Sequence, residues 1–252
     1  MKQIVLIGMG AGDPEQITVQ AINALNRADV VFLLDKGYEN DDLLRLRKVV
    51  CQRYMTGDDY RLVQVQDPRR EDDQQSYERG VEHWHEQRAM LFERLIQDEL
   101  TADQVGAFLI WGDPSLYDST LRILDRVLAR GREVFEYHVI PGITSVQALV
   151  ARHRIPLNRI GEPVSITTGR RIAASQERQP DNVVVMLDAH CSFERFVGQG
   201  LDIYWGAYLG TPDEILISGR LDDVCERIKQ LRAEARERKG WVMDTYLLRK
   251  PV

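Results

Sequence analysis

The sequence has few cysteines and no long apolar run. Its 252 residues include only three cysteines, Cys51, Cys191 and Cys225, and no two of them have CxxC spacing. An odd number of widely spaced thiols argues against a disulfide framework or a structural zinc site, so we expect no metal. No segment approaches the roughly 20 apolar residues that a membrane helix needs, and no secretory signal is visible. These absences predict a cytoplasmic protein without a membrane partner.

An excess of basic residues is also missing, since the formal net charge is -6. Proteins that bind nucleic acid usually carry a basic excess to neutralise phosphates, so we expect no nucleic-acid partner. A local group of basic residues can still attract a small anionic molecule, because the field in a cleft depends on nearby charges. With 44% apolar and 29% charged residues, the composition is that of a folded globular protein.

Short apolar runs alternate with helical patterns along the whole chain. Strands are predicted at residues 4–7, 30–34, 62–65, 108–110, 134–140, 164–168, 183–187, 203–209, 215–218 and 241–248. Helices are predicted from Thr18, after Asn40, over 76–100, before Gly131, over 145–151 and over 221–239. The alternation predicts an α/β fold with mainly parallel sheets covered on both faces, at least in the first half. Two prolines and a glycine within 153–163 predict a link between two α/β domains, 1–153 and 154–252.

Three loops of unusual composition follow predicted strands in the first half. They are GMGAGDP at residues 8–14, WGDPSLY at 111–117 and IPGITS at 140–145. Open α/β sheets bind ligands at the carboxyl ends of their strands, so three such loops predict one shared crevice. Each loop also has a plainer interpretation. The first can be a tight turn, Asp113 can cap the next helix with Pro114 in its first turn, and Thr144 and Ser145 can cap another.

The order of these motifs resembles the tetrapyrrole (corrin/porphyrin) methylases. Ile155-Pro156-Leu157, VSITTG at 164–169 and LGTPDE at 209–214 continue the likeness, which therefore spans nearly the whole chain. The resemblance implies two α/β domains with S-adenosyl-L-methionine bound in a cleft between them, and S-adenosyl-L-homocysteine as a product. It also implies a homodimer and a small-molecule tetrapyrrole substrate.

The resemblance also implies particular binding residues. The methyl-donor contacts would be Pro14, Gly112, Asp113, Leu116, Thr144, Ser145, Met186, Leu187 and Ala207. The register at 186–187 stays open, because Asp188-Ala189-His190 follows. Substrate contacts would be Gly10, Gly12, Lys36, Arg170 and Arg171, of which the three basic residues suit the carboxylates of a tetrapyrrole.

Three further stretches resemble one subgroup of this family. They are residues 33–37, residues 67–70, and Trp84-His85 followed by Arg88-Ala89. The subgroup methylates C-1 of precorrin-5 with loss of acetate, giving precorrin-6A in cobalamin biosynthesis. Loss of acetate needs water to add to a carbonyl, and hence a general base. Asp35 and His85 are the candidates, although a histidine within a helix is more often a packing or surface residue.

Other functions stay open at this point. The chain can be another precorrin or tetrapyrrole methyltransferase, whereas an RNA methylase is disfavoured by the acidic balance. A nicotinamide oxidoreductase would need GxGxxG, and the first loop has GxGxG instead. A non-catalytic tetrapyrrole-binding protein is the remaining class. Binding of S-adenosylhomocysteine but not NAD(H) would exclude the oxidoreductase, and turnover would exclude the carrier.

Overall fold

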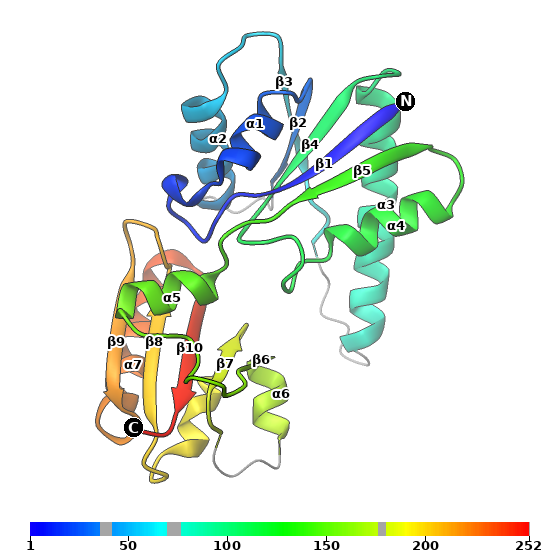
Figure 1. The fold of residues 1–252 in the computed structure, drawn as a ribbon. Coiled ribbons are helices and arrows are strands. Elements are labelled where there is room, and N and C mark those ends of the chain that lie inside the picture. Colours follow the sequence, from blue (N-terminus) through cyan, green and yellow to red (C-terminus); the bar gives the residue numbers. More distant parts are fainter. Residues whose placement is uncertain (36–41, 70–76, 176–179, 252) are drawn as a thin grey trace. The chain divides into compact units, whose positions relative to one another are not determined.

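The structure is a computed structural model that describes residues 1–35, 42–69, 77–175 and 180–251 (Figure 1). Its internal contacts divide the chain into two compact units. The first comprises Met1–Gly10 and Pro14–Thr144, and the second comprises Ala11–Asp13 and Ser145–Val252. The predicted domains, 1–153 and 154–252, remain a proposal about which parts fold independently. Among the described residues, none of the helices combines the length and apolar character that a membrane span requires.

The first unit contains a sheet of five parallel strands in the order β3-β2-β4-β1-β5. The strands are β1 (Lys2–Gly8), β2 (Val30–Asp35), β3 (Arg61–Gln66), β4 (Val105–Ile110) and β5 (Phe135–Ile140). The last residue of β1, Gly8, is in register with Ile110, the last residue of β4. The parallel sheet predicted for the first half is therefore confirmed, and its central strands end at one edge.

Helices cover both faces of this sheet (Figure 1). They are α1 (Val19–Leu25), α2 (Asp42–Tyr54), α3 (Tyr77–Glu99) and α4 (Thr120–Ala129). Ile4 and Leu6 of β1 pack in the core with α3 and α4, whereas Val5 and Ile7 pack in the core with α1 and α2. Both faces are buried, which is why these strands have continuous apolar sequences rather than alternating ones.

The second unit contains a mixed sheet in the order β6-β7-β10-β8-β9. Its strands are β6 (Ser165–Thr168), β7 (Val183–Met186), β8 (Asp202–Ala207), β9 (Ile215–Arg220) and β10 (Asp244–Arg249). Only β6 and β7 pair in parallel, and the other pairs are antiparallel. The expectation of mainly parallel sheets thus fails in the second half. The last strand enters between β7 and β8, a long-range pairing that no local pattern reveals.

Two helices pack on this second sheet. Figure 1 shows α5 (Ser145–His153) on one face and α7 (Leu221–Lys239) on the other. The short helix η2 (Ser192–Phe196) packs beside α7. The predicted stop of α7 is confirmed, because Gly240 follows it with a left-handed φ of 78°. The sequence did not predict α6 (Gly169–Ala174), a single short helix that Thr168 caps by accepting a hydrogen bond from the Arg171 N–H.

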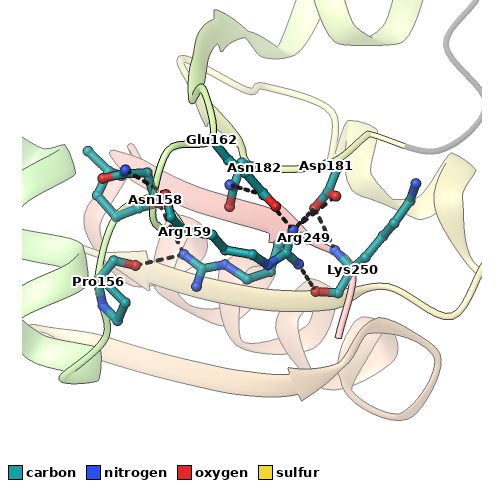
Figure 2. Close-up of polar contacts among 9 residues, drawn as sticks. Pro156, Asn158, Arg159, Glu162, Asp181, Asn182, Arg249 and Lys250 are labelled. Atoms are coloured by element: carbon teal, nitrogen blue, oxygen red, sulfur yellow. Dashed lines mark hydrogen bonds and ion pairs between the residues drawn. The ribbon is translucent and has the colours of Figure 1, made fainter. Parts of the chain in front are cut away.

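The segment from residue 154 to 164 contains neither helix nor strand, as its prolines and glycine predicted. Buried Arg249 fixes it to the end of β10, since its Nη2 donates to the carbonyls of Pro156 at 2.8 Å and Leu157 at 3.1 Å. Arg159 forms an ion pair with Asp181 at 3.0 Å (Figure 2). This segment, which lies within the second unit, is therefore held against the amino end of β7 and the carboxyl end of β10.

Candidate functional site

The loops after β1, β4 and β5 meet through their backbones at one edge of the first sheet. A Cβ added to Gly8 would lie 2.6 Å from Gly142 N and 2.8 Å from Gly112 O. The Gly112 N–H also donates to the Gly10 carbonyl at 2.8 Å. No residue larger than glycine fits this approach. The three loops predicted to share a crevice are thus in direct contact.

Asp113 fastens two of these loops together. Its Oδ1 accepts hydrogen bonds from the Ser115 N–H at 2.8 Å and from the Ser115 hydroxyl, and its Oδ2 accepts from the Gly142 N–H at 2.8 Å. Partial burial opposes ionisation, but these hydrogen bonds hold the pKa of Asp113 below its ordinary value. The carboxylate is therefore charged at neutral pH and fixed in direction.

The plainer interpretation of Asp113 as a helix cap is wrong. Helix α4 begins only at Thr120, and the Asp118 carboxylate accepts the Thr120 N–H at 2.7 Å. Asp113 instead closes a local turn with Ser115, an alternative that short acidic side chains offer the backbone. The turn leaves Leu116 half-buried, with its N–H donating to the Asp113 carbonyl at 3.3 Å.

The remaining first-unit candidates lie in the same group of loops. Pro14 begins the short helix η1 (Pro14–Gln16), and its carbonyl accepts the Tyr54 hydroxyl at 3.1 Å. Gly10 has a left-handed φ of 88°. Thr144 is half-buried, and its Cα is the nearest atom, at 3.8 Å, to a Cβ added to Gly112. A Cβ at Gly112 would therefore make only an ordinary van der Waals contact, although the φ of 67° itself favours glycine there.

The second sheet gathers further candidates at one of its ends. Strand pairing sets Thr168 opposite Met186, Met186 opposite Thr245, and Ala207 opposite Asp244. The candidates at this end are Ser145, Arg170, Arg171, Met186, Leu187 and Ala207. Ser145 joins them because its Oγ accepts a hydrogen bond from the Thr245 hydroxyl at 3.0 Å.

The side chains at this end differ in what they can offer a ligand. Arg170 and Arg171 lie exposed in the first turn of α6. Ala207 is fully buried in the core beneath α7, so only its backbone remains available. Gly12 packs against the carbonyl of Leu209, and a Cβ there would overlap that oxygen. Gly12 therefore allows the turn at 209–211 to approach closely.

Two exposed apolar side chains lie on left-handed backbone, one in the loop after β4 and one directly after β7. Tyr117 and Leu187 both have a φ of 53°, and their side chains are 43% and 60% exposed. A non-glycine residue in this region costs about 1–3 kcal/mol and is found most often at functional sites. Leu187 was a sequence candidate, whereas Tyr117 ends the second loop motif and had no assigned role. In the sequence, only its position next to the candidate contact Leu116 indicates that Tyr117 could belong to the site.

The two candidate bases have different surroundings. Asp35 ends β2 half-buried, and its Oδ2 accepts a hydrogen bond from the Gln64 side chain of β3 at 2.8 Å. His85 lies in α3 and is only 6% exposed. Burial, and then the charges of Arg126 and Arg122, lower the pKa of His85 below its ordinary value. Lys36 lies outside the described residues.

Comparison with known proteins defines the class to which this architecture belongs. The family profile "Tetrapyrrole (Corrin/Porphyrin) Methylases" matches residues 3–225. The chain belongs to this family, as the order of its loop motifs predicted. It is 53% identical over 250 residues to a precorrin-6A synthase (deacetylating) from Sinorhizobium sp, a match that covers 99% of this chain and 96% of the relative.

Solved structures agree with this fold. A cobalamin synthesis related protein (CobF) from Corynebacterium diphtheriae superposes with a TM-score of 0.86 at 38% identity, covering 99% of both chains. A uroporphyrin-III C-methyltransferase from Thermus thermophilus, solved in complex with S-adenyl homocysteine, superposes with a TM-score of 0.57. It is 20% identical, and the match covers 97% of this chain and 91% of that one. At this identity it shows a shared fold.

Proposed function

We propose that the chain is an S-adenosylmethionine-dependent methyltransferase that converts precorrin-5 to precorrin-6A in cobalamin biosynthesis. It would methylate C-1 and release acetate. The observation that carries the proposal is the 53% identity to a deacetylating precorrin-6A synthase across 99% of the chain. The subgroup motifs around Asp35, Asp67 and Trp84 support it. A homodimeric state and a cytoplasmic location belong to the same proposal.

The strand-end loops fit a sulfonium methyl donor. When bound, S-adenosylmethionine would supply a methyl group already activated by the positive charge on sulfur. The uncrowded backbone at Gly112 and the fixed carboxylate of Asp113 suit a polar nucleoside or amino-acid group. The exposed apolar side chain of Leu187 suits the weakly polar surroundings of the methyl. The proposed contacts are Pro14, Gly112, Asp113, Leu116, Thr144, Ser145, Met186, Leu187 and Ala207.

The proposed reaction balances with one water molecule. Asp35 removes a proton from water as the oxygen adds to the acetyl carbonyl. The bond between the acetyl carbon and C-1 then breaks, acetic acid departs, and the electron pair stays on the macrocycle at C-1. That electron pair would accept the methyl group, which S-adenosylmethionine bound at the proposed contacts would supply from its sulfonium sulfur. One proton is released to solvent in this step, and a second is released when the acetic acid ionises to acetate.

We assign the base role to Asp35 rather than to His85. Asp35 is half-buried at the carboxyl end of β2, the end of the sheet where the loop motifs gather. His85 is almost fully buried on a helix that covers the sheet face. Substrate carboxylates would be bound by Arg170 and Arg171, together with Lys36, while Gly10 and Gly12 allow close approach of backbone.

The test is an anaerobic incubation of the chain with S-adenosylmethionine and precorrin-5, assaying acetate and product mass together. One methyl gained with one acetate released supports the proposal. Methyl gain without acetate would assign the chain to another tetrapyrrole methylation. Binding of S-adenosylhomocysteine without any turnover would favour a non-catalytic tetrapyrrole-binding protein.

A pair of variants then tests the base. Asp35→Asn should lower acetate release by about 10²–10⁴-fold, the usual contribution of a general base. The exposed loop residue Asp59 provides the control, and Asp59→Asn should keep the wild-type rate. Full acetate release by Asp35→Asn would show that another group removes the proton.

A further inference from the structure

A buried carboxylate lies directly after Leu187. Asp188 is only 4% exposed, yet its two oxygens accept four hydrogen bonds. Oδ1 accepts from His190 N–H at 3.0 Å and from the Ser192 hydroxyl at 2.9 Å. Oδ2 accepts from Ser192 N–H at 2.6 Å and from the Tyr246 hydroxyl at 2.8 Å. The side chain therefore fixes the loop between β7 and η2 to the first residue of η2 and to β10.

The backbone of Asp188 is held as firmly as its side chain. Arg232 of α7 donates from Nη2 to the Asp188 carbonyl at 2.7 Å and from Nε to Asp244 Oδ2 at 3.0 Å. Trp205 of β8 donates to the same Asp244 oxygen at 2.9 Å. Five side chains of the network are buried, namely Asp188, Trp205, Arg232, Asp244 and Tyr246. The end of β7 is therefore joined to two strands and a helix.

Asp188 also sets the position of α6. A Cβ added to Gly169, the first residue of α6, would lie 2.5 Å from both Cα and Cγ of Asp188. Glycine is therefore required where the helix begins, and the helix rests directly on this carboxylate. The next two residues are the exposed Arg170 and Arg171.

These contacts explain how an unfavourable conformation persists. Leu187 keeps a left-handed backbone and a side chain that is 60% exposed, so its own packing cannot stabilise it. Such a conformation survives only when its surroundings determine it. The residue that follows Leu187 has every carboxylate oxygen and its carbonyl engaged, which supplies that constraint.

We infer that Asp188 is a positioning residue for the reaction proposed above. It holds Leu187 in the left-handed conformation that presents this residue to the methyl donor, and it holds α6 so that Arg170 and Arg171 meet substrate carboxylates. The inference rests on the proposed function. Asp188 would act through Leu187 and α6, without itself contacting the methyl donor or the tetrapyrrole.

The first variant is Asp188→Asn in the full chain, since the amide turns one acceptor into a donor facing N–H or O–H groups. Isothermal titration with S-adenosylhomocysteine should give a Kd at least roughly tenfold higher, the scale of one lost hydrogen bond to a charged group. The KM for precorrin-5 should rise similarly while kcat changes less. Hydrogen exchange at the amides of residues 187 and 170–172 should become faster.

Asp181→Asn provides the matched control. Asp181 lies just before β7, and Figure 2 shows its carboxylate with Arg159 and the Lys250 backbone. It accepts the Lys250 N–H at 3.0 Å through Oδ1, and the Arg159 guanidinium lies 3.0 Å from Oδ2. The same substitution therefore again turns an acceptor that faces a donor into a donor, here at the opposite end of the strand. We expect a lower melting temperature with an unchanged Kd for S-adenosylhomocysteine and an unchanged KM.

Each outcome has one meaning. If Asp188→Asn keeps the wild-type Kd, KM and exchange rates, the positioning role is overturned. If Asp188→Asn does not fold, Tyr246→Phe removes a single one of the four hydrogen bonds and should raise the same Kd by a few-fold. An unchanged Kd in that folded variant would likewise overturn the role. If the wild-type chain itself binds no S-adenosylhomocysteine, the proposed function fails instead.

Discussion

The two units shape their strand ends by opposite means. In the first unit, three loops approach one another closely through their backbones, because the residues at the contacts are glycines: Gly8, Gly112 and Gly142. In the second unit, the buried side chains of Asp188 and Arg232 hold the strand ends from within. Glycine motifs are visible in a sequence, because each glycine stands beside the loop that it shapes. A buried polar network joins residues far apart in the chain and leaves no local pattern.

The largest expected effect is in the buried network of the second unit. Arg232→Met should lower the free energy of unfolding by about 3–5 kcal/mol, because it leaves the Asp244 carboxyl buried without its cation. The double variant Arg232→Met with Asp244→Asn should recover much of this loss. Urea denaturation followed by circular dichroism measures both.

Lys229 supplies the control on the same helix. It pairs with Glu194 at 2.6 Å and Glu226 at 3.0 Å, but these carboxylates are largely exposed. Lys229→Met should therefore change the free energy of unfolding by only about 0–1 kcal/mol. Equal losses for Arg232→Met and Lys229→Met would contradict the idea that burial makes the network essential.

Gly142→Ala tests the glycine-built loops of the first unit. The new Cβ would overlap the Gly112 carbonyl and lie 2.8 Å from Gly8 Cα. Forcing the three loops apart should cost about 1–3 kcal/mol of unfolding free energy and abolish measurable binding of S-adenosylhomocysteine. Gly57 has open space where a Cβ would be, so Gly57→Ala should change neither quantity. Wild-type binding by Gly142→Ala would show that the close approach serves packing alone.

The sequence predicted most of the first unit for reasons that remain visible in the structure. The Thr18 hydroxyl accepts the Ala21 N–H at 3.0 Å and starts α1 as expected. Alternate residues of β1 pack on opposite faces of the sheet, as a buried parallel strand requires. The loop motifs after β1, β4 and β5 meet because parallel strands end at one edge.

The errors came where distant residues decide the local structure. Asp113 was given a plausible role as a helix cap, but its carboxylate accepts the Gly142 N–H from another loop. The antiparallel insertion of β10 depends on pairing with β7 and β8, which are far away in sequence. In the sequence, Asp188 only leaves the register at 186–187 open. Its partners Tyr246 and Arg232 lie 58 and 44 residues further along the chain.

One threonine helix cap in each unit allows a comparison of smaller changes in the free energy of unfolding. Thr18 caps α1 of the first unit, and Thr168 caps α6 of the second by accepting the Arg171 N–H at 3.4 Å. Thr18→Ala should cost about 1 kcal/mol of unfolding free energy and leave the KM for precorrin-5 unchanged. Thr168→Ala should cost no more than that, because its hydrogen bond is longer. It should raise the KM, since α6 carries Arg170 and Arg171. An unchanged KM would show that α6 does not contribute to substrate binding.

The smallest expected effect is a pH dependence in the first unit. Burial, followed by the charges of Arg126 and Arg122, lowers the pKa of His85 in the folded chain from its ordinary value of 6.5. The unfolded chain therefore binds this proton first as the pH falls. The contribution of neutral His85 to stability is complete above pH 6.5 and is lost as the pH falls from there through the folded-state pKa.

His85→Gln should flatten this part of the plot of unfolding free energy against pH. His83→Gln, two residues away on an exposed position, should keep the wild-type slope. A slope that survives His85→Gln would assign the acid sensitivity to another group.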